Sequence, residues 1–121
     1  MRLSTQTEAL TALETHYQFM VWLIPTLEKF PRSQKFLLGD RIQTLATELL
    51  EVLIDATYTK LRAKLLAQAN LLLEKLRYLI RISYDLKHLN TRRYEHAIRL
   101  LAEVGKRIGS WVKNDRAAKE T

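Results

Sequence analysis

The chain has 121 residues, of which 47% are apolar, and this is enough to bury one continuous core. It contains no cysteine, which excludes disulfide bonds, thiolate metal sites and a thiol nucleophile and fits a reducing, intracellular setting. Its longest uninterrupted apolar run, residues 19–25, is too short to span a bilayer, so we expect a cytoplasmic protein without a signal peptide or membrane association.

The net charge of +7 is divided unevenly along the chain. Residues 1–60 hold six Lys and Arg against seven Asp and Glu, whereas residues 61–121 hold fourteen against six. A basic excess confined to one half predicts an anionic partner, either a polyanion or an acidic protein. A net charge of this size also keeps an ordinary small domain in solution, so charge alone does not choose between these interpretations.

The first helix is predicted over residues 5–30, because Thr5-Gln6-Thr7-Glu8 has the spacing of a capping box. Pro25 lacks the N–H that would bond to Val21, which predicts a kink or break there. The residues that recur at core-facing spacing are Leu13, Tyr17, Met20, Ile24 and Leu27, while Phe19, Trp22 and Leu23 fall on other faces. Either this helix is central, or a second apolar flank meets another subunit, and a small bundle favours the second alternative.

A second helix is predicted over residues 34–57, after Pro31 ends the first helix and Ser33 offers a cap. Its expected core-facing residues are Leu38, Ile42, Leu45, Leu49, Leu53 and Ala56. Its exposed side is expected to be acidic and to carry Asp40, Glu48, Glu51 and Asp55. Thr57-Tyr58-Thr59 predicts the turn that follows, since Thr favours a cap over a helix interior.

The third helix, predicted over residues 60–88, carries two arginines on the side opposite its apolar residues. The expected core-facing residues are Leu65, Ala69, Leu72, Leu76, Ile80 and Ser83. Arg77 and Arg81 stand one turn apart, so their charges repel unless something anionic lies nearby. Glu74 and Asp85 offer ordinary surface pairs, and an anionic partner is the alternative.

The fourth helix is predicted over residues 92–112, after an N-cap at Asn90-Thr91. Its expected inward residues are Tyr94, Ile98, Leu101, Ile108 and Val112. Gly105 and Gly109 each cost about 0.5–1 kcal/mol relative to Ala, which indicates close approach by another backbone, of a helix or a subunit. Residues 1–113 therefore form one domain with a flexible polar tail at 114–121, and four helices with short turns predict an all-α, antiparallel up-down four-helix bundle.

No constellation of residues indicates catalysis or a cofactor. The glycine-rich phosphate loop and the Ser, His and acid arrangements of hydrolases are missing from the sequence. Asp85-x-x-His88 occurs once near a helix end, and one isolated pair does not make the inward-facing metal site of a bundle. We therefore expect no enzyme, no metal and no cofactor.

Three segments, in this order and with these gaps, resemble a known family. They are FPRSQKFLLGDRI (residues 30–42), LAQANLLLEKLRYLIRISYDLKHL (66–89) and RRYEHAIRLLAEVGKRIGSW (92–111). They are similar to the accessory variability determinant proteins of diversity-generating retroelements. The resemblance implies a homopentameric barrel of four-helix bundles with a positively charged channel, which associates with the reverse transcriptase of the same element. It also implies binding of RNA and DNA, as template RNA and its cDNA, during mutagenic retrohoming.

The resemblance places the family's basic positions on Arg77 and Arg81. We expect the wider nucleic-acid and reverse-transcriptase surface to include Lys75, Arg92, Arg93, Arg99, Lys106, Arg107 and Lys113. We expect the subunit interface to include Trp22, Gly105, Gly109 and Trp111. Two alternatives stay open: a protein–protein adaptor that does not bind nucleic acid, and a ribosome-associated four-helix bundle.

Overall fold

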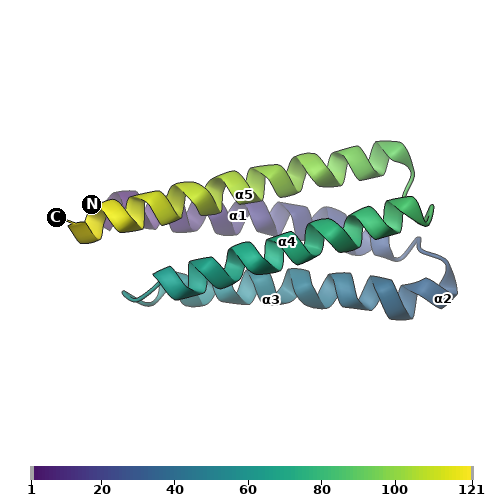
Figure 1. The fold of residues 1–121 in the computed structure, drawn as a ribbon, viewed down its shortest axis with the longest axis horizontal. Helices are drawn as coiled ribbons and strands as arrows, with labels where there is room; N and C mark the ends of the chain where they lie inside the picture. The colour runs from purple at the N-terminus through teal and green to yellow at the C-terminus, as the bar shows by residue number, and fades with distance from the viewer. Residues whose placement is uncertain (1, 121) are drawn as a thin grey trace.

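The computed structural model describes residues 2–120, with side chains from residue 7 onward, and it consists of helices joined by short turns (Figure 1). The elements are α1 (Arg2–Leu27), α2 (Arg32–Gln34), the π-helix η1 (Lys35–Gly39), α3 (Asp40–Thr57), α4 (Ala63–Asp85) and α5 (Thr91–Glu120). Residues 2–120 contain no strand, which confirms the predicted all-α, four-helix fold. Within this range no helix combines the length and apolar character needed to cross a bilayer.

The four long helices lie side by side, and each one packs against two of the others. Helix α1 contacts α5 and α3, and α4 contacts α3 and α5. Helices α3 and α5 therefore occupy one diagonal of the bundle, and α1 and α4 occupy the other. Both ends of the chain lie at the same end of the bundle as the α3–α4 turn (Figure 1).

The predicted core faces of α3 and α4 are confirmed. On α3, the buried residues include Ile42, Leu45, Leu49, Leu53 and Ala56, while Leu38, which lies in η1, is half-buried. On α4, they include Ala69, Leu72, Leu76, Ile80 and Ser83. These positions recur every three or four residues, so one face of each helix is buried against the neighbouring helices.

The core face of α1 differs from the prediction. Tyr17 and Ile24 are exposed, whereas Phe19 and Leu23 are almost fully buried. The helix also starts at Arg2, before the predicted capping box, and the side chain of Thr5 lies outside the described residues. Pro25 does not break α1, which continues to Leu27. Because proline has no backbone N–H, Pro25 cannot donate a helical hydrogen bond, and it lies only two residues before the end of α1.

Helix α4 ends through a backbone motif that contains no glycine. Lys87 has a φ of 67°, in the left-handed region, and the N–H of His88 donates to the carbonyl of Ser83 at 2.8 Å. This is the hydrogen bond that closes a Schellman motif. The chain then turns to Asn90, whose Oδ1 accepts from the backbone N–H of Arg93 at 2.8 Å and caps the start of α5, as predicted.

Helix α5 does not end near residue 112 but continues to Glu120. Asp115, which was expected in a flexible polar tail, is 5% exposed. Its carboxylate lies 3.7 Å from Arg62 and 3.0 Å from Lys119. Arg62 also donates to the carbonyls of Ala56 and Thr59, so it ties the α3–α4 turn to α5. This tertiary contact holds the last turns of α5 against the bundle. The polar sequence of residues 114–121 does not reveal it, because Arg62 is distant in the chain.

His16 is a polar residue inside the core. Its Nε2 donates to the carbonyl of Ala46 on α3 at 2.8 Å, while its buried Nδ1 has no partner among the described residues. Burial lowers the pKa of His16 below its ordinary value of 6.5, against a smaller raising effect of the Ala46 hydrogen bond. The folded protein therefore holds this ring in its neutral form.

Acidification is expected to destabilise the protein through His16. The unfolded chain takes up the proton near pH 6.5, before the folded chain does, so stability falls as the pH decreases from 6.5 through the lowered pKa. Chemical denaturation from pH 8 to pH 5 of the parent and His16→Leu chains measures this effect, because His88 and His96 are common to both. A stability difference between the two chains that stays constant with pH would contradict it.

Candidate nucleic-acid interface

Four of the predicted basic residues form one exposed row along α5. Arg92, Arg99, Lys106 and Lys113 follow one another at intervals of seven residues, which is close to two helical turns, and all four are exposed. Within the described part of the chain none of the four forms an ion pair. We call these four residues the α5 ridge. Their charges are free to meet an anion outside the molecule.

Two other predicted cations of α5 lie beside the ridge and are less accessible to an external anion. Arg93 and Arg107 are half-buried, and Arg107 pairs with Glu103 at 2.9 Å. The Nε of Arg107 is buried and has no partner among the described residues. These two arginines therefore belong to a second face of α5, closer to the neighbouring helices.

On α4, the carboxylate pairs considered for Arg77 and Arg81 both form. Arg77 lies 3.3 Å from Glu74, and Arg81 lies 3.9 Å from Asp85. These pairs are largely exposed, and exposed pairs contribute only about 0–1 kcal/mol. Each arginine thus already has an anion within its own helix, and mutual repulsion does not require an external one.

Arg77 also extends over α5 at Gly105. A Cβ built at Gly105 would lie 2.7 Å from Nη2 of Arg77 and 3.2 Å from Leu73. The sequence predicted that another backbone approaches Gly105. In the structure the approach is made instead by side chains of the same chain. Arg77 consequently places its charge beside the turn of α5 that carries Lys106.

The other predicted residues are not part of the α5 ridge. They are Lys75, predicted to bind nucleic acid, and the predicted subunit-interface residues Trp22, Gly109 and Trp111. Lys75 lines a groove between α3 and α4, on another side of α4. Trp22 is half-buried against His96, with ring centroids 5.0 Å apart. Gly109 is exposed, and a Cβ added there would have open space around it within the described structure. Trp111, predicted at the subunit interface, is fully buried in the core of its own chain.

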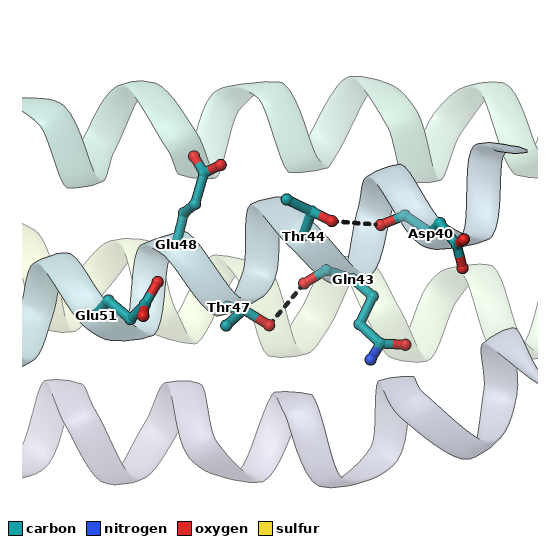
Figure 2. Close-up of a pocket in the computed structure, with 6 residues that line it drawn as sticks. All are labelled: Asp40, Gln43, Thr44, Thr47, Glu48 and Glu51. Carbon is teal, nitrogen blue, oxygen red and sulfur yellow. Dashed lines mark hydrogen bonds between the residues drawn. The ribbon is translucent and has the colours of Figure 1, made fainter. Parts of the chain in front are cut away.

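The opposite corner of the bundle is acidic, as predicted from the sequence. Asp40, Glu48, Glu51 and Asp55 are all exposed on α3. Figure 2 shows part of this surface, where a shallow hollow of about 490 Å³ is lined by residues of α3 alone. The hydroxyls of Thr44 and Thr47 donate to the backbone carbonyls of Asp40 and Gln43, and not to the carboxylates. Because α3 and α5 lie on a diagonal, the two signs of charge are kept apart.

The described residues contain no group of three His, Cys, Asp or Glu side chains that could hold a metal ion. The fold and its charged faces define an all-helical four-helix bundle with a basic and an acidic surface. A sequence model of the family described as bAvd-like matches residues 10–114, and the chain belongs to this family. This confirms the resemblance to the accessory variability determinant proteins. No curated protein sequence matches the chain.

Proposed function

We propose that this protein is the accessory factor of a diversity-generating retroelement and that it binds template RNA and its cDNA along the α5 ridge. It does so without catalysing a reaction itself, in a complex with the reverse transcriptase of the same element. Family membership supports the accessory role. The observation that carries the nucleic-acid proposal is the row of four exposed cations that have no ion-pair partner within the described residues.

The α5 ridge suits a phosphate backbone better than a base sequence. From residue 92 to residue 113 the helix rises by about 32 Å, so the four charges follow an extended path. Lys and Arg contacts to phosphates supply affinity and set the position of the strand, but they carry no sequence information. Selectivity in the complex would then come from the reverse transcriptase.

Self-assembly is part of the proposal. The family resemblance implies a homopentamer, in which five copies would place five α5 ridges around one axis. Exposed apolar residues on α1, which a single copy leaves in contact with water, support assembly of some kind. The copy number itself comes from the resemblance.

Removal of three ridge charges is expected to weaken RNA binding strongly. In Arg99→Gln/Lys106→Gln/Lys113→Gln, the loss of three phosphate contacts lowers the slope of log affinity against log salt by about 2, and affinity falls roughly 100-fold at 0.1 M salt. Titration of single-stranded RNA at several salt concentrations measures both quantities. The matched control, Lys29→Gln/Arg32→Gln/Lys60→Gln, removes the same charge from residues outside α5 and is expected to bind far more tightly than the ridge variant.

The paired arginines provide a second comparison. Arg77→Ala/Arg81→Ala is expected to weaken RNA binding less than the ridge variant, because both arginines already contact carboxylates. A folded ridge variant that keeps its RNA affinity would contradict the nucleic-acid proposal. If that variant also lost the reverse transcriptase, the basic face would instead be a docking surface for an acidic protein.

A further inference from the structure

One face of α1 is apolar and exposed along most of the helix. Leu10, Tyr17, Val21 and Ile24 follow at intervals of seven, four and three residues, so they lie on one side, and they are 67%, 52%, 51% and 38% exposed. We call these four residues the α1 stripe. Glu14 lies on the same side of the helix, between Leu10 and Tyr17, and is also exposed. The stripe therefore combines large apolar side chains with one carboxylate.

A second apolar surface lies between α3 and α4. The α3–α4 groove has a volume of about 290 Å³, and Leu45 and Leu79 lie within it beside Leu71 and Tyr78, which are 56% and 57% exposed. Arg41 and Lys75 also line the groove and are exposed. Neither of these two cations forms an ion pair within the described residues. Glu74 lines the groove as well, but its carboxylate already pairs with Arg77 at 3.3 Å. The groove therefore combines an apolar floor with a rim of these two cations and one paired carboxylate.

The stripe and the groove are complementary in both polarity and charge. A stripe packed against a second stripe would bring two copies of Glu14 together, and a groove packed against a second groove would bring the cations Arg41 and Lys75 together. A stripe packed in a groove instead sets Glu14 against Arg41 and Lys75 over an apolar contact. The Glu74 carboxylate beside these cations is already paired with Arg77. Electrostatic complementarity therefore favours the mixed pairing over both like pairings.

A single chain does not make this contact with itself. Helix α1 packs against α3 and α5, while the groove lies between α3 and α4, and both surfaces are exposed in one copy. We propose that the α1 stripe of one copy packs into the α3–α4 groove of a second copy. Such a contact is heterologous, so each copy offers one stripe and one groove, and repetition gives a ring or a filament. The inference rests on the self-assembly proposed above.

The proposed contact leaves the basic surface free. Neither the α1 stripe nor the α3–α4 groove includes a residue of α5. The contact therefore does not use any of the four cations of the α5 ridge.

Because the chain has no cysteine, introduced thiols report the contact directly. Chains with Val21→Cys and Tyr78→Cys are coexpressed and treated with a short bismaleimide. We expect a covalent dimer from the mixture and none from either variant alone. The matched control replaces Tyr78→Cys with Thr47→Cys, on the polar surface of α3, and is expected to give no dimer. Dimers from Val21→Cys alone or from Tyr78→Cys alone would show a like pairing and overturn the proposal.

Light scattering on the same samples separates this proposal from self-assembly itself. An assembled parent that gives no mixed dimer would overturn the stripe-and-groove contact while self-assembly stands. A parent with the mass of one chain, 14.2 kDa, would overturn both. We further expect Val21→Glu to reduce the assembly to this mass while the helix signal in circular dichroism is retained. RNA titration of that variant tests the α5 ridge independently.

Discussion

Replacement of Trp111 by Ala is expected to lower the free energy of unfolding by about 3–5 kcal/mol. Trp111 is fully buried and belongs to the single hydrophobic core, together with its α5 neighbours Val104 and Ile108. Removal of so large a side chain leaves a cavity that the surrounding helices can only partly close. Denaturation in urea, followed by circular dichroism at constant protein concentration, measures the loss.

Trp111→Phe is the matched comparison for this site. The indole Nε1 of Trp111 is buried without a partner in the described part of the chain, so the substitution removes an unsatisfied donor along with part of the ring. These two effects oppose each other, and the expected loss stays below about 2 kcal/mol. If Trp111→Ala instead kept the parent's stability and lost only assembly, Trp111 would be an interface residue and the core assignment would be wrong.

Arg62→Met is expected to lower the free energy of unfolding by about 2–4 kcal/mol. Arg62 donates to the carbonyl of Ala56 at 3.1 Å and to that of Thr59 at 2.6 and 3.1 Å, and it lies 3.7 Å from the buried carboxylate of Asp115. Without Arg62, the turn carbonyls lose these donors, and among the described residues Asp115 keeps Lys119 as its one ion-pair partner. Calorimetry or urea denaturation measures the change.

A double-mutant cycle isolates the contact between α5 and the turn. Asp115→Asn removes the carboxylate charge, and combined with Arg62→Met it should cost less than the sum of the two single substitutions. Lys119→Gln is the control for the exposed side of the cluster, since the Lys119 side chain is 45% exposed and its pair is worth about 0–1 kcal/mol. Strict additivity in the cycle would show that Arg62 acts on the turn alone.

The parts of the fold that the sequence predicted well are those with one clear apolar face. Helices α3 and α4 repeat large apolar residues every three or four positions, and these residues are buried as expected. Helix α1 is apolar on several faces, so periodicity did not distinguish Tyr17 and Ile24, which are exposed, from the buried Phe19 and Leu23. The choice depended on where the other three helices lie, and local sequence does not contain that information.

The end of α5 was missed for a related reason. Residues 114–121 are polar, and a polar segment without partners has little to hold it in a helix. The partner of Asp115 is Arg62, more than fifty residues earlier in the chain, on a turn whose position follows only from the fold. The left-handed backbone conformation of Lys87 at the end of α4 was also not predicted, because glycine usually occupies such a position.

For the candidate site, the sequence named the basic residues but not which of them lack a carboxylate partner. The expected repulsion between Arg77 and Arg81 pointed to α4 as the binding surface. Both arginines pair with carboxylates of α4, and the four ridge cations, which form no ion pair within the described residues, lie on α5. The seven-residue spacing of these four cations is visible in the sequence and predicts that they share one face of a helix. The burial of Trp111 and the placement of Lys75 in a separate groove could be known only once the helices were packed.

The diagonal placement of α3 and α5 gives the bundle an electric dipole across its short dimension, because acidic side chains lie at one corner and basic ones at the other. A polyanion at a distance exerts a torque on such a molecule and turns α5 toward itself before any atom touches. The bundle is therefore more often oriented with α5 toward the polyanion when the two meet. For the proposed nucleic-acid partner, the acidic side chains of α3 would repel a strand that arrives there, while the basic side chains of the α5 ridge would attract it.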